Sequence, residues 1–199
     1  MTTQKPSRRR RAATAPKFTV PGMTKKDAVA LIDLLQQRLV SLTDLALTLK
    51  HVHWNVIGPN FIAVHTMLDP QVDAIHPMVD EIAERIATLG GEPNGLAGGI
   101  VATRTWDDYD VGRAPALEHL GALDVVYQGV VEDHRKAVDE VESLDLVTQD
   151  MLIGHLEKLE LFHWFVRGHL ESMDGSLVTG GATTERGAQR KVRASRKKA

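Results

Sequence analysis

The chain has 199 residues, of which 43% are apolar and 25% charged, an ordinary balance for one globular domain with or without tails. It contains no cysteine, which excludes disulfides and thiolate metal sites and is compatible with a cytoplasmic protein. No uninterrupted apolar run is long enough to cross a bilayer, and no apolar stretch follows the N-terminal arginines, so neither a membrane partner nor a secretory signal is expected.

The net charge of −2 hides three blocks of opposite sign. Residues 1–17 hold six basic residues and no acid, while residues 179–199 hold seven basic residues and one acid, so each end carries +6. The 11 basic and 25 acidic residues that remain give 18–178 a charge of −14. Both ends lack apolar periodicity and are rich in small and polar residues, which predicts disordered basic tails around a single domain over 18–178.

The first long helical pattern begins near Thr24, where Asp27 three residues later approximates a capping box. Apolar residues follow at spacings of three and four, which is the stripe of an amphipathic helix. The stripe comprises Leu31, Leu34, Leu35, Leu39, Leu42, Leu45, Leu49 and Val52. The Gly58-Pro59 pair is expected to end this helix.

The second pattern runs from about residue 60 to residue 89, where a Gly-Gly pair is expected to stop it. Pro70 and Pro77 lie inside this pattern. Each proline removes a backbone donor, so we expect the helix to bend there.

A polar link over 92–112 follows, in which 106–109 can form a short helix. Two further helices are expected over about 114–144 and 148–172. The first and second helices are joined by few residues, as are the third and fourth, so each pair should be antiparallel. The long link between the pairs permits one crossover. The sequence therefore predicts an all-α fold, a ferritin-like four-helix bundle with one long crossover carrying a short helix.

Four potential metal ligands lie on one narrow stripe of the second helix, namely His65, Asp69, Asp80 and Glu84. Imidazole and carboxylate ligands together suit iron, manganese or zinc. A rise of about 1.5 Å per residue separates Asp69 from Asp80 by about 16 Å, so one chain cannot bring both to a single cluster. A second chain lying antiparallel across a two-fold axis would place His65 and Asp69 opposite its Asp80 and Glu84, which gives two equivalent sites per dimer.

Two other interpretations of these residues stay open at this point. The stripe also includes Asp73 and His76, and such a pattern is equally that of a solvated helix face. A di-metal site inside one bundle would need two Glu-x-x-His motifs on separate helices. Only one such motif is present, Glu160 to His163, which favours a structural role for it.

Two longer segments resemble the signature of the Dps family of mini-ferritins. The first reads HVHWNVIGPNFIAVHTMLD over 51–69 and contains the pattern H-W-N-x-x-G-x-x-F-x-x-x-H, and the second reads DEIAERIATLGG over 80–91. The similarity extends through TWDDY at 105–109 and WF at 164–165, so that it covers about 20–172.

The resemblance implies a ferroxidase centre that binds iron and is shared by two subunits. His53, His65 and Asp69 would come from one subunit, and Asp80 and Glu84 from the other. This assignment agrees with the antiparallel pairing inferred from the helical stripe.

The match selects His53 rather than His51, since the two side chains point about 160° apart on a helix and cannot face one site. Trp54 would lie beside the centre, either as an electron relay or, more simply, as a tryptophan buried in an interface. The remaining histidines match no ligand position and are expected to be structural: His76, His119, His134, His155 and His169.

The resemblance also implies oxidation of Fe²⁺ with hydrogen peroxide in preference to dioxygen, and storage of ferric mineral inside a hollow dodecameric shell. The charge of −14 over 18–178 fits an acidic interior that attracts Fe²⁺. Asp145 and Asp150 lie in the short link into the fourth helix, where family members line a three-fold iron pore with acids. The alternative role for this pair is N-terminal capping, because acids there complement the helix dipole.

The basic tails are expected to bind double-stranded DNA without sequence preference, because flexible Arg and Lys side chains neutralise phosphates without reading bases. Some Dps proteins bind DNA through such extensions and others do not, so a solubilising or membrane-surface tail is the alternative. Many copies on one shell would strengthen binding through avidity. The residues expected to contact DNA are Arg8, Arg9, Arg10, Arg11, Arg190, Lys191, Arg193, Arg196, Lys197 and Lys198.

The favoured function is a ferroxidase and iron store that protects nucleoid DNA in the cytoplasm from oxidative damage. One alternative is a nucleoid-compacting structural protein without significant ferroxidase activity. Another is a helical oligomer with neither activity.

Overall fold

The fold was examined in a computed structural model, which describes residues 16–196. In that range the chain forms six helices and one pair of two-residue strands. In chain order the elements are α1 (Lys25–Asn55), β1 (Val56–Ile57), α2 (Phe61–Thr88), α3 (Ala97–Thr103), β2 (Ala114–Pro115), α4 (Ala116–Val141), α5 (Leu146–Gly168) and α6 (Glu185–Arg196).

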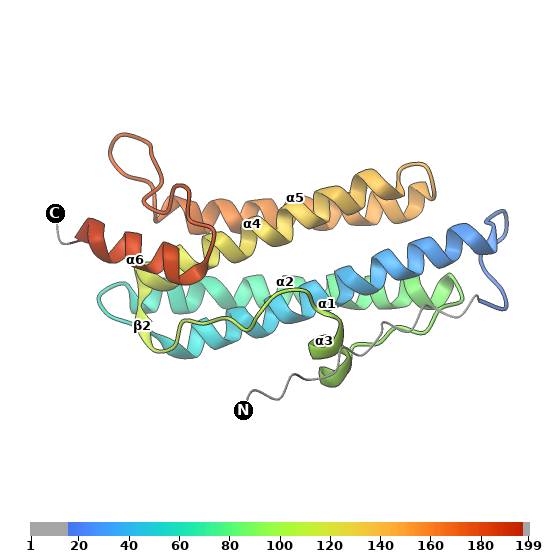
Figure 1. Ribbon diagram of the computed structural model, residues 1–199, viewed down its shortest axis with the longest axis horizontal. Coiled ribbons are helices and arrows are strands. Elements are labelled where there is room, and N and C mark those ends of the chain that lie inside the picture. The colour runs from blue at the N-terminus through green and yellow to red at the C-terminus, as the bar shows by residue number, and fades with distance from the viewer. Residues whose placement is uncertain (1–15, 197–199) are drawn as a thin grey trace, which may run out of the picture.

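Four long helices form the bundle that the sequence predicts. The hairpin of α1 and α2 lies against the hairpin of α4 and α5, and the segment between α2 and α4 passes over α1 (Figure 1). Gln36 on α1 fixes that segment through two hydrogen bonds to the backbone of Asn94. The all-α ferritin-like arrangement with one long crossover is therefore confirmed.

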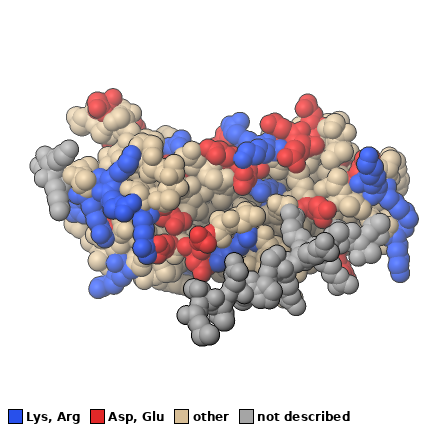
Figure 2. All heavy atoms as spheres, viewed as in Figure 1, with Lys and Arg blue, Asp and Glu red and all other residues tan. Residues whose placement is uncertain are grey.

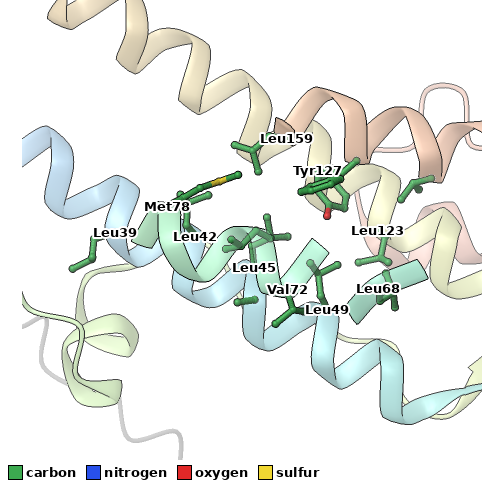
Figure 3. Close-up of a cluster of buried hydrophobic side chains, with 14 of the residues drawn as sticks. Leu39, Leu42, Leu45, Leu49, Leu68, Val72, Met78, Leu123, Tyr127 and Leu159 are labelled. Atoms are coloured by element: carbon green, nitrogen blue, oxygen red, sulfur yellow. The ribbon is translucent and has the colours of Figure 1, made fainter. Parts of the chain in front are cut away.

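Apolar side chains from all four long helices fill the centre of the bundle (Figure 3). The stripe from Leu31 to Val52 predicted for the first helix faces this core, apart from Leu34, which is half-buried. Tyr127 on α4 is fully buried, and its hydroxyl donates to Gln71 Oε1 on α2 at 2.6 Å. This bond satisfies the one polar atom that the tyrosine takes into the core.

Two helix starts agree with their sequence signals. The backbone N–H of Asp27 donates to Thr24 Oγ1 at the N-cap of α1. The backbone N–H of Thr148 donates to Asp145 Oδ2 at the N-cap of α5. These bonds satisfy donors that have no partner in the first helical turn.

The short helix of the crossover is displaced from its expected place at 106–109 and lies at Ala97–Thr103 instead. The indole of Trp106 donates to Asp44 Oδ2 at 2.5 Å, and Arg104 forms an ion pair with Asp44 Oδ1 at 3.2 Å. Two bonds to one carboxylate on α1 hold 104–106 against that helix, which a local pattern could not reveal. Ile100 in α3 is buried and gives the short helix its own anchor.

The prediction of a disordered tail over 179–199 is wrong for 185–196, which form α6. Ala188 and Val192 lie one turn apart and are buried against α4. They pack at Gly121, where an added Cβ would lie only 2.9 Å from Val192 Cγ2. The missing side chain of this glycine permits the close approach of the two helices.

Polar contacts add to the docking of α6. Glu118 on α4 is buried and accepts from Gln189 Nε2 at 2.7 Å and from Arg193 Nη2 at 2.8 Å. Arg186 forms a further ion pair with Asp110 in the crossover segment. Two apolar residues in a charged segment are too weak a pattern to predict a helix. The helix is stabilised by its contacts with Gly121 and Glu118 on α4.

A parallel pairing of β1 with β2 was not expected from the sequence. Val56 pairs with Ala114 and Ile57 with Pro115, so the crossover is tied to the turn between α1 and α2. Gly58 in this turn has a φ of +98°, a conformation that favours glycine. Among residues 16–196, no helix is both long enough and apolar enough to span a bilayer.

Candidate metal centre

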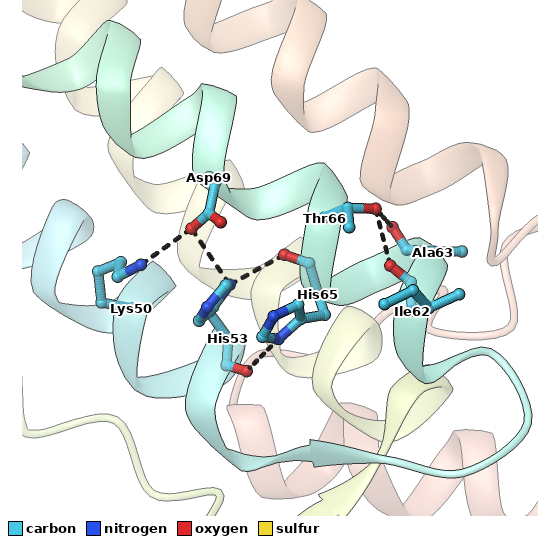
Figure 4. A network of polar contacts seen from close by, with 7 residues as sticks. All are labelled: Lys50, His53, Ile62, Ala63, His65, Thr66 and Asp69. Carbon is cyan, nitrogen blue, oxygen red and sulfur yellow. Dashed lines mark hydrogen bonds and ion pairs between the residues drawn. The ribbon is translucent and has the colours of Figure 1, made fainter.

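His53 and His65 meet where α1 ends and α2 begins (Figure 4). The tight turn that contains Gly58 brings the two helix ends together. The imidazole rings are stacked, with centroids 3.6 Å apart and an angle of 23° between their planes. His53 is 8% exposed, so its ring is largely withdrawn from water.

The two histidines exchange hydrogen bonds with each other's backbone. His53 Nδ1 lies 2.9 Å from the carbonyl oxygen of His65, and His65 Nδ1 lies 3.0 Å from that of His53. A carbonyl oxygen can only accept, so both Nδ1 atoms carry protons, and in the neutral form of each ring it is Nε2 that has the lone pair able to bind a metal. Metal-binding histidines are commonly fixed by such a bond from the second ring nitrogen.

Asp69 lies one helical turn beyond His65 and completes a group of three candidate ligands. Its Oδ1 is 3.2 Å from His53 Nδ1 and 2.9 Å from Lys50 Nζ (Figure 4). The hydrogen bond from Lys50 is the main reason that the pKa of Asp69 is lowered, and the charges of the nearby histidines add to it. Lys50 was not singled out from the sequence, although it precedes His53 by three residues.

Asp80 and Glu84 lie further along α2, on exposed positions. They are not brought to His53, His65 and Asp69, which agrees with the spacing of about 16 Å expected from the helical rise. Within one chain, over the described range 16–196, no three His, Asp or Glu side chains are gathered closely enough to hold a metal ion. The five residues can therefore share a metal only if a second chain supplies part of the set.

Large apolar side chains are exposed beside the three ligands. Trp54 is 71% exposed and Ile62 63% exposed, and Phe61 is partly exposed. A patch of this kind marks an interaction surface rather than a free surface. Trp54 is thus not covered by the described part of its own chain, and a partner is the expected cover.

Asp145 is engaged within the chain, whereas Asp150 is exposed. Asp145 caps α5 and forms an ion pair with Arg85 Nη2 at 2.5 Å. Burial opposes ionisation of Asp145, but the hydrogen bonds from Thr148 and Arg85 outweigh it and lower its pKa. The capping role is thus present for Asp145, whereas Asp150 forms no ion pair with another residue of 16–196.

The Glu-x-x-His motif does not form a metal site within the bundle. His163 Nε2 bonds to buried Asp124 Oδ1 at 2.8 Å, and Asp124 also accepts from Arg167 Nε at 3.0 Å and Thr179 Oγ1 at 2.6 Å. Burial opposes ionisation, but these three bonds outweigh it and lower the pKa of Asp124 to about 2. This network joins α4, α5 and the segment before α6, and no sequence signal pointed to it.

Three of the histidines expected to be structural, His119, His134 and His155, are buried. The Nδ1 of His119 is paired with Tyr109 and the Nε2 of His155 with Glu81. His76 and His169 are exposed.

Basic side chains gather at the end of the molecule where α6 lies (Figure 2). Arg190, Lys191, Arg193 and Arg196 are exposed on α6, although Arg193 is also bonded to Glu118. The other expected DNA contacts lie outside the described residues: Arg8, Arg9, Arg10, Arg11, Lys197 and Lys198.

Comparison with known proteins gives consistent matches. The family model for the ferritin-like domain matches residues 32–176. The chain is 57% identical to the DNA protection during starvation protein of Mycolicibacterium smegmatis over 88% of this chain and 96% of that relative. It is similar to the structure of DpsA14 from Streptomyces coelicolor, with a TM-score of 0.82, 60% identity and coverage of 83% of this chain and 99% of that one. A more distant match is Dps from Microbacterium arborescens in the high iron form, with a TM-score of 0.70, 28% identity and coverage of 78% and 99%.

Proposed function

The chain belongs to the Dps family of ferritin-like proteins, and from this premise we propose that it is a ferroxidase and iron store that also binds and protects DNA. Iron is the substrate and the stored cargo. The protein would assemble into a hollow dodecamer, work in the cytoplasm and associate with the nucleoid. The alternative is a nucleoid-compacting protein with little ferroxidase activity.

The ferroxidase centre would form across a two-fold axis. His53, His65 and Asp69 of one subunit would face Asp80 and Glu84 of the partner subunit. Neutral imidazole nitrogens and carboxylate oxygens suit Fe²⁺ and bind Fe³⁺ more strongly as the charge rises. Two Fe²⁺ ions supply the two electrons that reduce one hydrogen peroxide to two waters, with uptake of two protons.

The paired hydrogen bonds between His53 and His65 carry this proposal. They hold the two rings in place and direct Nδ1 of each to a carbonyl oxygen, so that Nε2 of the neutral ring is the nitrogen available to a metal. Asp69 lies next to the same two rings, so that two imidazoles and one carboxylate are available to a metal from one side. The exposed Trp54 and Ile62 support the same site, because a partner that covers them also closes the centre.

An anaerobic titration with Fe²⁺ followed by addition of oxidant tests the ferroxidase proposal. The wild type should bind Fe²⁺ saturably and turn it over faster with hydrogen peroxide than with dioxygen. His53→Ala and His65→Ala should lose binding and fast oxidation, whereas the exposed His76→Ala should retain both. Equal rates in all three variants and the wild type would favour the compacting protein.

DNA binding is proposed for the exposed basic face of α6 together with the N-terminal arginines. Contacts to phosphates make affinity fall steeply with salt and nearly independent of base sequence. Replacing Arg190, Lys191 and Arg196 with Gln should weaken binding of a random duplex at moderate salt while the assembly stays intact. Deletion of residues 1–15 in the same assay measures how much the N-terminal arginines contribute to DNA affinity. Undiminished binding in the combined variant would move the DNA site onto another surface.

A further inference from the structure

A pocket of about 360 Å³ lies between α1 and α4, away from the candidate metal centre. The crossover residues 105–107 and Tyr109 form part of its wall, and residues 183–185 at the start of α6 form another part. Its size is within the range of small-molecule sites in proteins. None of the proposed ferroxidase ligands and none of the residues proposed to contact DNA lines this pocket.

Apolar side chains from two helices line part of the pocket. Leu45 comes from α1, and Val125, Val126 and Val130 come from α4. Gly129 lies among these valines, and a Cβ added there would meet nothing within 4 Å. The absent side chain therefore leaves part of the pocket open. Along α4 the lining extends from Val125 to Asp133, a rise of about 12 Å.

The rim of the pocket carries four carboxylates and no Lys or Arg: Asp44, Asp107, Asp133 and Glu185. Asp44 is paired with Arg104, and Asp133 with the exposed Lys136. Among residues 16–196, Asp107 and Glu185 have no ion-pair partner. Burial raises the pKa of Glu185, and the negative charges of Asp110, Asp107 and Asp44 raise it further. Two of the four carboxylates, Asp107 and Glu185, are thus left to bind a cation at the pocket.

Two buried hydroxyl groups line the same pocket. Ser41 is 5% exposed and Thr48 9% exposed, and neither side chain forms a hydrogen bond with another described residue. Trp106 and Tyr109 add aromatic side chains to the lining of the pocket. Unpartnered hydroxyls and aromatic faces are groups that an ammonium ion contacts favourably.

We propose that this pocket binds a linear polyamine, with ammonium groups at the carboxylates and the methylene chain along the valines. A divalent metal ion does not fit, because among the described residues no three ligand side chains converge. An anion is excluded by the charge of the rim. A long molecule that alternates cationic nitrogens with short apolar segments matches both the acidic rim and the apolar inner surface. The pocket includes the first residue of α6, so an occupied site would lie directly beside the basic helix.

The test is calorimetric titration of the intact, iron-free assembly with spermidine, in excess Mg²⁺ to suppress diffuse counterion binding. Saturable binding with one molecule per chain is expected. Removal of two charges in Asp107→Asn with Glu185→Gln should weaken affinity by about tenfold or more. Gly129→Leu should block the pocket without changing any charge.

Matched controls separate the pocket from general electrostatics. Asp139→Asn with Glu142→Gln removes the same charge from exposed positions on α4 and at its end, and should bind spermidine like the wild type. Gly154→Leu places the same side chain at an open glycine of α5 and should also be neutral. The proposal is wrong if Mg²⁺ abolishes binding, if both pairs of acidic substitutions weaken it equally, or if Gly129→Leu binds as tightly as the wild type.

Discussion

Lys50 occupies the place beside Asp69 that a metal cation would need. Its ammonium group is 2.9 Å from Asp69 Oδ1 and competes with any cation for that oxygen. Replacement of Lys50 with Met removes one positive charge next to the centre, so Fe²⁺ should bind roughly three- to tenfold more tightly, a gain limited by solvent screening. Anaerobic calorimetry of Fe²⁺ binding measures this directly.

Lys50→Arg is the matched control, because it keeps the charge and should leave the affinity close to that of the wild type. Weaker Fe²⁺ binding in Lys50→Met than in Lys50→Arg would show that Lys50 supports the ligands rather than competing with iron.

His134 makes the bundle sensitive to acid. It is fully buried with neither ring nitrogen hydrogen-bonded, and burial, together with the charges of Arg38 and His155, lowers its pKa to about 3. In the unfolded chain His134 binds a proton near pH 6.5, whereas in the folded protein it does so only near pH 3. The contribution of the neutral His134 to the free energy of unfolding is therefore fully present above pH 6.5 and is lost as the pH falls towards 3. Between pH 6.5 and pH 5 this histidine alone should lower the free energy of unfolding by about 2 kcal/mol.

Urea unfolding of His134→Phe at pH 7 and pH 5, at equal subunit concentration, tests this origin. The variant removes the titrating group and keeps an aromatic ring, so its loss of stability on acidification should be smaller than that of the wild type. The exposed His76→Gln should behave like the wild type. An unchanged pH dependence in His134→Phe would assign the acid sensitivity to other groups.

At the scale of elements, the long helices could be predicted because each carries an apolar stripe, a start signal and a stop signal in its own sequence. The short crossover helix could not be placed, since Trp106 and Arg104 are held by Asp44, a residue about 60 positions away. Helix α6 was not predicted from the sequence for a related reason. Its two buried residues gain their stability from Gly121 and Glu118 on another helix.

In the docked α6, Arg193 and Arg186 form ion pairs with Glu118 and Asp110, so under the proposed function these two charges are not free to contact DNA. Glu118→Gln should release Arg193, so duplex DNA should bind more tightly at low salt. The plot of log affinity against log salt should become steeper by about 0.9 for one added phosphate contact. Fluorescence anisotropy over a series of salt concentrations measures both quantities.

Glu142→Gln removes one acid from an exposed position and serves as the control for the general change in charge. If both variants steepen the salt dependence equally, the contact between Arg193 and Glu118 does not restrain the helix.

Substitutions at the start of α5 can distinguish helix capping from lining of an iron pore, the two roles that the sequence left open for Asp145 and Asp150. Asp145→Ala removes the cap and leaves Arg85 without its partner, so the free energy of unfolding should fall by about 1–2 kcal/mol. Asp150→Asn should leave stability unchanged and slow iron uptake, with a defect that shrinks as salt rises. Stopped-flow uptake and urea unfolding are the two measurements, and normal uptake by Asp150→Asn would remove the pore role.

At the scale of the whole molecule, the separation of Asp69 from Asp80 along one chain could be predicted from the sequence, because it follows from the helical rise alone. The proposed partition of the ligands between two chains rests on that separation. The hydrogen bonds between His53 and His65 could not be inferred. They depend on the angle at which α1 and α2 meet across the turn at Gly58, and on the strand pairing that closes this end of the bundle. The distance between two residues of one helix can be calculated from their positions in the sequence. The distance between the ends of two helices depends on how those helices pack.

The central claim is that each ferroxidase site takes ligands from two subunits, and mixed assemblies test it most directly. His65→Ala and Glu84→Ala should each be nearly inactive in fast oxidation of Fe²⁺ by peroxide. Random co-assembly of equal amounts gives dimers of which half are mixed, and each mixed dimer has one intact site and one that lacks both ligands. About one quarter of wild-type activity should therefore return, as the two-fold symmetry of the dimer requires. Mixed assemblies that are verified by mass spectrometry and remain as inactive as the single variants would contradict the shared site.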